Sequence, residues 1–365
     1  MAFAMPAYHP PDFAKPPLKD APVVSFAPVM EKGIAPENYH ATTIFPEYYQ
    51  LSKATWFLLK DSRMDCVMVL SPDGSLKAKE FHHLEKGEQV ALGRGENGED
   101  GIYVHPEAFA QPPPAHEKFA FRTLPTRETS FSIDYDELYE LMAYERENGF
   151  ILWVMGPAAV FDRDSRNALV ELIRQGYVHG LIAGNALAVH DLEAALFQTA
   201  LGQEIYGKRL APRGHYHHLD AINLVRRAGS MARAMEDGLV HDGVMHALWQ
   251  KQIPLVLAGS IRDDGPLPEV VKDAMQAKDA MRALTARATT VIAVATQLHS
   301  IAVGNLTPGY RVLPDGQIRP VYFYVVDMSE FAAEKLTNRG SLAARGILTN
   351  AQDFLVILQR GLSRR

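Results

Sequence analysis

The chain has 365 residues, of which 47% are hydrophobic and 22% are charged, and its formal net charge is −6. This length and apolar content suffice for a large core and favour more than one domain, while the lack of long basic runs argues against nucleic-acid or membrane-surface binding. No apolar run reaches the ~18 residues of a membrane span, and the single cysteine, Cys66, excludes an internal disulfide, so we expect a reducing, cytoplasmic setting.

The first 125 residues divide into two expected parts. Residues 1–40 are rich in proline and alanine and favour extended chain, so we expect an arm that lies on a surface or a partner. Residues 41–125 predict a β-rich module, with strands at 55–59, 66–70, 89–92 and 102–105 between turn residues. Cys66 begins one of these apolar runs, and we interpret it as a buried packing residue rather than a nucleophile.

One segment of this module, Gly93-Arg-Gly-Glu-Asn-Gly98, has the glycine spacing of a dinucleotide-binding fingerprint. That fingerprint has meaning only between a strand and the start of a helix. No helical pattern follows here, and Glu96, Glu99 and Asp100 would repel a pyrophosphate. The segment is therefore interpreted as a loop of the β module.

Residues 126–365 predict an α/β domain, because short apolar runs alternate with amphipathic helical patterns. The expected strands are 151–155, 179–183, 254–258, 290–295 and 321–326, and the expected helices include 135–148, 165–175, 221–236 and 268–287. Such alternation is typical of a mainly parallel sheet with helices on both faces. Ligands of such sheets bind outside the carboxyl ends of the strands.

The segment Val256-Leu-Ala-Gly-Ser-Ile-Arg-Asp-Asp-Gly-Pro-Leu-Pro268 places Arg262, Asp263 and Asp264 directly after a strand. Charged residues at this position favour a ligand site. The alternative is a solvated turn with a local Arg–Asp pair.

Two other expected strands also end in residues that suit a ligand site. In Ala183-Gly-Asn-Ala-Leu-Ala-Val-His-Asp191, small residues carry the chain from a strand into a helix whose free amides can bind phosphate. Asn185 is then either a ligand contact or the helix cap. After the strand at 290–295, Thr296 and His299 would face the same crevice, although a single histidine can also be structural.

Asp327 ends the last strong strand, where a carboxylate suits the hydroxyl groups of an adenosine ribose; the alternative is a helix cap. The run Gly214-His-Tyr-His-His-Leu-Asp220 contains His215, His217 and His218, which suit polar substrate contact or proton transfer or are ordinary histidines. We expect no metal site, because no cysteine pair or His-Glu-x-x-His helix accompanies them.

These segments together resemble a known family, the archaeal-type, NAD-dependent ornithine cyclodeaminases, which carry the LOR/SDH conserved region. The resemblance is carried by Gly156-Pro-Ala158, by the motifs 183–191 and 258–268, and by Leu298-His-Ser-Ile-Ala-Val-Gly-Asn305. It implies a Rossmann-like domain of the deoxyhypusine synthase type, an N-terminal β-rich module, a recycled NAD and self-association as a homodimer or larger homo-oligomer. The cofactor contacts that it implies are Asn185, Ala186, Asp264, Thr296, Gln297, Leu298, His299, Asp327, Asn350 and Ala351. This sequence departs from the family pattern at His217, Gln297 and Asn350, where the family usually has Asn, Met and Asp.

The resemblance implies conversion of L-ornithine to L-proline and ammonia, through removal of a hydride from the substrate and its return. By charge logic, Arg262 would hold the α-carboxylate and Asp263 the δ-ammonium group, His217 would contact the substrate, and His215 or His218 would take a proton from the α-amine. The alternatives are another NAD-dependent amino-acid or polyamine dehydrogenase or cyclodeaminase, such as a lysine-type enzyme, and a non-catalytic NAD-binding module.

Overall fold

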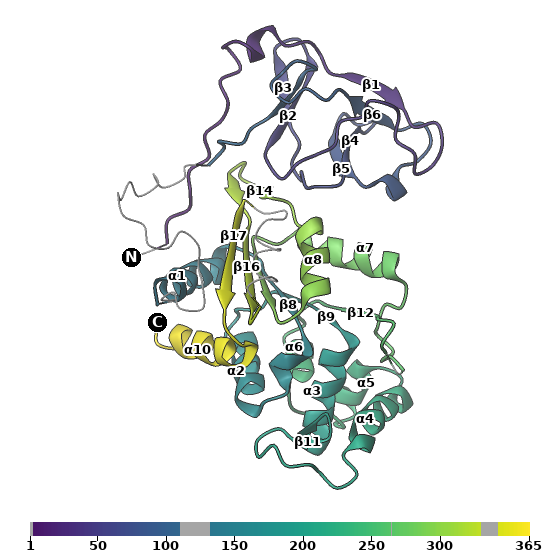
Figure 1. Ribbon diagram of the computed structural model, residues 1–365, viewed down its shortest axis with the longest axis vertical. Coiled ribbons are helices and arrows are strands. Elements are labelled where there is room, and N and C mark those ends of the chain that lie inside the picture. Colours follow the sequence, from purple (N-terminus) through teal and green to yellow (C-terminus); the bar gives the residue numbers. More distant parts are fainter. Residues whose placement is uncertain (1–2, 110–131, 264, 330–341) are drawn as a thin grey trace.

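The computed structural model describes residues 3–109, 132–263, 265–329 and 342–365, with the backbone alone for 132–134. Figure 1 shows two parts: strands β1 to β7 form a module at one end of the molecule, and the remaining elements form a larger α/β domain. None of the helices in the described part of the chain combines the length and the hydrophobicity that a membrane crossing requires.

The N-terminal module is built from two antiparallel sheets. The first has the order β1-β6-β4-β5, and the second has the order β3-β2-β7. Their bounds are Ser25–Pro28 (β1), Glu47–Ser52 (β2), Thr55–Leu58 (β3), Val67–Leu70 (β4), Leu76–Lys79 (β5), Gln89–Leu92 (β6) and Ile102–Val104 (β7). Cys66 is buried between the sheets with Tyr49, Met68 and Ile102, as predicted. The glycine-rich segment that follows β6 is a loop, in which the Asp100 carboxylate accepts the amides of Arg94 and Gly95.

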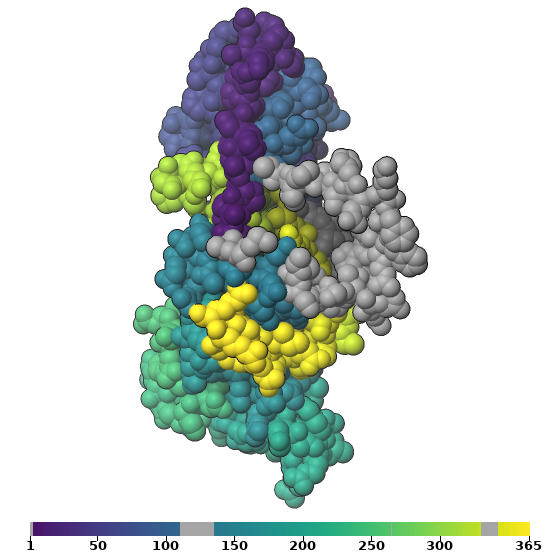
Figure 2. Space-filling view, turned by 90° about the vertical axis from the view of Figure 1, so that its left-hand side faces the viewer, coloured from purple at the N-terminus to yellow at the C-terminus, as the bar shows by residue number. Residues whose placement is uncertain are grey.

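The expected boundary at residue 40 falls inside this module. Strand β1 comes from the proline-rich segment and pairs along its length with β6. Before β1, a 3-10 turn spans Leu18–Asp20, and the first residues run over the surface of both parts of the molecule (Figure 2). Phe13 stacks on Trp56 of the β module, and Phe3 packs against Tyr144 and Tyr322 of the α/β domain. The arm therefore lies on the chain's own surface.

The α/β domain contains a six-stranded parallel sheet with the order β12-β9-β8-β13-β16-β17. The strands are Ile151–Met155 (β8), Gly180–Gly184 (β9), Leu255–Ala258 (β12), Thr290–Val294 (β13), Tyr322–Asp327 (β16) and Ala343–Leu348 (β17). In sequence order this arrangement is 3-2-1-4-5-6, the doubly wound order of Rossmann domains. The ligand crevice of such domains opens where the strand order reverses, here between the parallel strands β8 and β13. The predicted fold class is thus confirmed.

Helices cover both faces of the sheet because side chains alternate along each strand. On β8, Ile151, Trp153 and Met155 face one helical layer, whereas Leu152 and Val154 face the other. The first layer holds α1 (Ser132–Asn148), α2 (Arg163–Arg174), α3 (Asn185–Phe197), α4 (His215–Ala228), α5 (Met231–Glu236), α6 (Val244–Gln250) and α10 (Ala351–Leu362). The second layer holds α7 (Ala274–Thr285) and α8 (Gln297–Leu306). Small hairpins, β10 (Thr199–Ala200) with β11 (Gln203–Glu204) and β14 (Tyr310–Val312) with β15 (Ile318–Pro320), and the 3-10 turns Phe81–His83 and Pro157–Val160 complete the described elements.

Two expected helices are shorter in the structure. The pattern at 221–236 covers two helices, because Gly229 adopts a left-handed φ of 91° that ends α4. Helix α7 begins only at Ala274, where the Asp273 carboxylate accepts the amides of Met275 and Gln276. Strand β17 was not predicted, since its pattern of half-buried residues has no clear alternation.

The two parts of the molecule meet through charged and polar contacts. The buried carboxylate of Glu80 lies 2.8 Å from Lys278 Nζ and 2.6 Å from an Arg282 guanidinium nitrogen, both on α7. The hydroxyl of Tyr310 on β14 donates to the carbonyl of Leu59. The β14–β15 hairpin leads into the first residue of β16, so this contact lies towards the amino ends of the strands.

Candidate functional site

The amino terminus of α3 follows directly from β9. Gly184 is the residue before the helix, and Asn185 is its first residue rather than its cap. The buried Asn185 side chain accepts a hydrogen bond from the amide of Leu267 at 3.1 Å. Asn185 thus ties the start of α3 to the segment that follows β12, while Ala186 beside it is half-buried.

The amino terminus of α8 follows β13 in the same way and brings a histidine to the same edge of the sheet. Thr296 Oγ1 and His299 Nδ1 are 3.2 Å apart. A Cβ atom placed on Gly184 would lie 3.0 Å from His299 Cε1, so the ring packs directly against the end of β9. Burial lowers the pKa of His299, an effect that Asp263 opposes and Arg262 reinforces. The charges of Asp263 and Arg262 are therefore close enough to His299 to affect its protonation.

The turn after β12 is closed by its own side chains. The Ser260 amide donates to the Asp263 carboxylate at 2.9 Å, and the Arg262 amide lies 3.2 Å from Ser260 Oγ. Arg262 is exposed and Asp263 is half-buried. Asp264, the third charged residue of this motif, lies outside the described residues.

The two helices that begin at this edge, like α4 and α6, start without a hydrogen bond from the side chain of the preceding residue. Asp162, Ser230, Asp273 and Asn350 cap the first turns of α2, α5, α7 and α10 with their side chains. No side chain in the described part of the chain caps α3 or α8. The first amides of a helix have no partner within it, and together with the helix dipole they favour an anion. Two uncapped starts on either side of β8 fit the pyrophosphate of a dinucleotide.

Apolar side chains are exposed at the same edge. Ile261, Leu298 and Met328 follow β12, β13 and β16 and are exposed by 106%, 75% and 61%. Gln297 beside Leu298 is also exposed. Large apolar groups at strand ends suit the flat faces of a bound nicotinamide or adenine better than they suit water.

The remaining predicted cofactor residues lie at the ends of β16 and β17. The Asp327 carboxylate accepts the amide of Ser329 at 2.9 Å and is half-buried. Asn350 caps α10, since its side chain accepts the Asp353 amide at 2.7 Å. Ala351, the first residue of that helix, is buried. The structure therefore gives Asn350 a structural task that the sequence pattern did not indicate.

The histidine-rich run lies at the far end of α4. Arg226, near the last turn of α4, contacts the carbonyl of Pro266 in the segment after β12. At 1.5 Å per residue, His215 and His218 lie roughly 16 Å and 12 Å further along the helix axis. His217 stacks on Phe197 at 4.7 Å and lies 2.9 Å from Thr199 Oγ1. In the described part of the chain, His217 and His218 contact α3 and the turn after it, and no contact joins them to Arg262 or Asp263. Their action on the substrate stays a prediction.

His218 belongs instead to a cluster with His190 and Glu193 of α3, whose possible ligand atoms lie within 4.8 Å of one another. Each Glu193 oxygen already has two partners: Oε1 accepts from Thr199 Oγ1 and the Gly202 amide, and Oε2 from the Leu201 amide and His190 Nδ1. These bonds occupy the acceptor capacity of the carboxylate. The cluster is therefore built to hold the 199–202 turn on α3.

Sequence reasoning missed the close contact between the ends of β8 and β13, where the strand order of the sheet reverses. A Cβ atom on Gly156, just after β8, would lie 1.9 Å from the carbonyl oxygen of Ala295, just after β13. Ala295 itself has a φ of 50°, a backbone conformation that residues other than glycine rarely adopt. This conformation costs about 1 kcal/mol or more of folding free energy. The segment Gly156-Pro-Ala158 was noted only through the resemblance, and nothing in the sequence pointed to Ala295.

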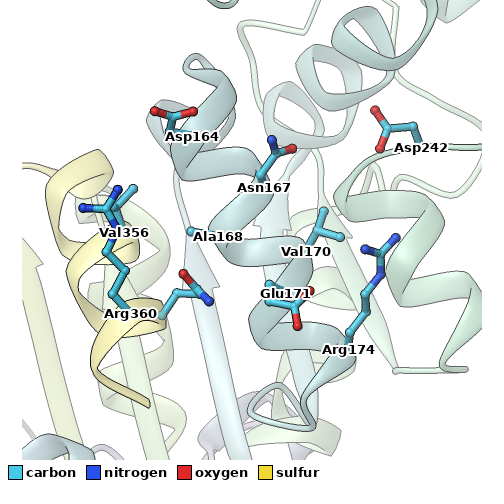
Figure 3. Close-up of a pocket in the computed structure, with 10 residues that line it drawn as sticks. Asp164, Asn167, Ala168, Val170, Glu171, Arg174, Asp242, Val356 and Arg360 are labelled. Atoms are coloured by element: carbon cyan, nitrogen blue, oxygen red, sulfur yellow. The ribbon is translucent and has the colours of Figure 1, made fainter. Parts of the chain in front are cut away.

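A hollow of about 430 Å³ lies on the outer helical layer between α2, α10 and Asp242 (Figure 3). Asp164, Glu171, Arg174 and Arg360 line it, so its walls carry both signs of charge. Asp242 is engaged with the buried guanidinium of Arg166 at 2.8 Å. Because no strand end opens into this surface, we place the candidate site at the carboxyl edge of the sheet.

Comparison with known sequences adds relatives of known activity. The chain matches the family described as arginine dihydrolase ArgZ-like, C-terminal, Rossmann fold, over residues 137–358. It is 37% identical to the ornithine cyclodeaminase of Archaeoglobus fulgidus over 343 residues, which cover 93% of this chain and 79% of that protein. It is 36% identical to the ornithine cyclodeaminase of Methanopyrus kandleri, with the same shares covered.

Two solved structures resemble the chain over nearly its whole length. A conserved putative LOR/SDH protein from Methanococcus maripaludis S2 superposes with a TM-score of 0.83 at 32% identity, covering 94% of this chain and 99% of that one. The ternary complex of AgrE with ornithine and NAD+ superposes with a TM-score of 0.58 at 31% identity, covering 95% of this chain and 46% of that one.

Proposed function

The chain belongs to the archaeal-type ornithine cyclodeaminase family, and from this premise we propose that it converts L-ornithine to L-proline and ammonia with a tightly bound, recycled NAD. The observation that carries the proposal is the convergence at one sheet edge. Asn185, Asp263 and His299 come from three segments far apart in the sequence. Leu267 binds Asn185, the ring of His299 lies against Gly184, and the charge of Asp263 acts on that ring. A Rossmann sheet binds its ligand at this edge.

The residues present fit a nicotinamide dinucleotide. The uncapped amides of α3 and α8 would face its pyrophosphate, and Asn185, Ala186, Thr296, Gln297, Leu298 and His299 flank them. Asp327 would bind ribose hydroxyl groups, with Asn350 and Ala351 at the next strand end. When bound, NAD supplies the acceptor and donor of the hydride, and the protein must orient the substrate and move protons.

The turn after β12 would bind the amino acid. The guanidinium of Arg262 suits two-point recognition of the α-carboxylate. Asp263 carries the opposite charge needed for the δ-ammonium group and is held by the Ser260 amide. Fixing both ends of ornithine brings its δ-nitrogen to the α-carbon, and such positioning can lower the barrier to ring closure by ~7–11 kcal/mol. His217 and His218 contact α3 rather than this turn, so we build the proposed substrate contacts on Arg262 and Asp263.

The test is incubation of the purified protein with L-ornithine, with mass spectrometry of the products and absorbance at 340 nm recorded together. We expect proline and ammonia in equal amounts without net NADH. Net formation of NADH would show that the protein is a dehydrogenase instead. Turnover of lysine but not of ornithine would show that it is a lysine-type cyclodeaminase. Bound NAD without turnover of any basic amino acid would instead indicate an NAD-binding module.

A further inference from the structure

We propose that His299 is the proton-transfer residue of this reaction, which accepts the proton of the substrate's α-amine. The inference rests on the proposed function and adds a residue role to it. Removal of a hydride from the α-carbon requires that the α-nitrogen also lose a proton. A group that takes it must lie at the edge where the substrate and cofactor meet.

The position of His299 meets this requirement. It lies in the first turn of α8, beside the charged turn that would bind the amino acid, and its ring packs on Gly184. The 3.2 Å contact between Nδ1 and Thr296 Oγ1 fixes the orientation of the ring. If Nδ1 donates to that hydroxyl, the lone pair of Nε2 is available to a substrate proton. The ring is only half-buried, so a ligand at the strand ends can reach it.

The charges around the ring suit a base that works near neutral pH. The positive end of α8 and burial both favour the neutral imidazole. Asp263 faces the ring from the turn after β12 and stabilises the imidazolium once it forms, while Arg262 from the same turn opposes it. Gly184 of β9 brings no charge, and Thr296 is the polar neighbour on its own helix. His299 therefore combines a neutral resting state with a carboxylate that favours proton uptake.

The step balances as follows. The N–H bond of the α-amine breaks, and its proton goes to His299 Nε2. The electron pair of that bond forms the carbon–nitrogen double bond, while the α-hydrogen leaves as hydride to the NAD of the proposed function. The α-carbon is oxidised and the cofactor is reduced. After the δ-amine has closed the ring and ammonia has left, the imidazolium can return its proton as the hydride comes back.

The test compares His299→Gln with His241→Gln, a matched change at an exposed histidine before α6. With saturating NAD and ornithine, we expect His299→Gln to lower kcat by about 10²–10⁴, with NAD still bound. The wild-type rate should fall as the imidazole becomes protonated, at a pH below the ordinary histidine value of about 6.5 because burial lowers the pKa of His299. This acidic limb should vanish in the variant. His241→Gln should keep both the rate and the limb.

Two further variants keep the test decisive if His299→Gln folds poorly. Thr296→Val removes the orienting contact and should lower kcat about threefold to tenfold with KM nearly unchanged. Asp263→Asn removes the charge that favours the imidazolium, so the acidic limb should move to lower pH. The proposal is overturned if His299→Gln retains kcat within threefold, or loses only NAD affinity. A wild-type protein without proline formation would instead refute the proposed function itself.

Discussion

Arg262 has an exposed side chain on a backbone that hydrogen bonds hold in place. Its backbone amide contacts Ser260 Oγ, and the same serine's amide is bound by Asp263, so the turn has a fixed shape although the guanidinium points into solvent. In the described part of the chain the Arg262 guanidinium makes no hydrogen bond or ion pair, and an exposed cation of this kind contributes little to stability. The role that we propose for it is to bind the substrate.

Replacement of Arg262 by alanine should therefore affect the substrate and leave the fold intact. A charged hydrogen bond contributes about 1.5–3 kcal/mol, so KM for ornithine should rise by about tenfold to hundredfold, with NAD still bound. Steady-state kinetics and NAD titration measure the two effects. Arg233→Ala, at an exposed position of α5, is the control. Unchanged KM in Arg262→Ala would remove this residue from the site.

At the scale of the element, α3 carries two different tasks on one rigid body. Its first residue, Asn185, binds the Leu267 amide at the sheet edge, and Glu193, two turns later, binds the amides of Leu201 and Gly202. Helix α3 packs against α4, and Arg226 in the last turn of α4 contacts the carbonyl of Pro266. The amino-terminal end of α3 therefore holds the segment after β12 at the candidate site, and its carboxyl-terminal end holds the β10–β11 hairpin.

Glu193→Gln should destabilise the protein in a pH-dependent way. The hydrogen bonds to Glu193 lower its pKa below the ordinary 4.5 against the opposing effect of burial. A carboxylate with a lowered folded pKa stabilises the native state above its unfolded pKa, and this stabilisation is lost as the pH falls through the folded pKa. The variant should lose about 1.5–3 kcal/mol of unfolding free energy at pH 7, and the gap should shrink below pH 4.5.

Urea denaturation at a series of pH values measures this difference. Glu236→Gln, which makes the same charge change at an exposed position of α5, is the control and should stay close to the wild type throughout. A loss in Glu193→Gln that does not vary with pH would show that the carboxylate's charge is not what holds the hairpin.

At the scale of the whole molecule, the β module lies away from the candidate site. It contacts α7 and the β14–β15 hairpin, whereas the site lies at the carboxyl ends of β9, β12 and β13 (Figure 1). The chain joins the two parts a second time through its first residues, since Phe3 packs on Tyr322. The module therefore contributes to the assembly of the chain rather than to the strand-end crevice.

Glu80→Gln tests this separation. Its carboxylate binds Lys278 and Arg282 across the junction while buried, so its loss should cost about 3 kcal/mol or more and lower the temperature at which the β module unfolds in calorimetry. The kcat value should remain within twofold. Glu85→Gln, which breaks an exposed pair with Lys32 inside the module, is the control. A matching fall in kcat would place the junction in the catalytic machinery.

The alternation of apolar runs and amphipathic helices was enough to predict five of the six sheet strands, and it also indicated the edge at which we propose the site. A strand that is buried on both faces is a continuous apolar run, such as Ile151–Met155, and such a run can be recognised from the sequence of the segment alone. The loop at Gly93 and the burial of Cys66 followed from equally local features.

The tertiary structure decided what local patterns cannot encode, namely which segments meet. Strand β1 forms in a proline-rich segment because β6 supplies its hydrogen bonds, and β17 because β16 does. The start of α8 lies against Gly184 and so brings His299 to the end of β9, whereas His217 and His218 of α4 contact α3. Periodicity along a chain records only whether each residue is buried, and the partners that bury it are fixed by how the chain crosses the sheet.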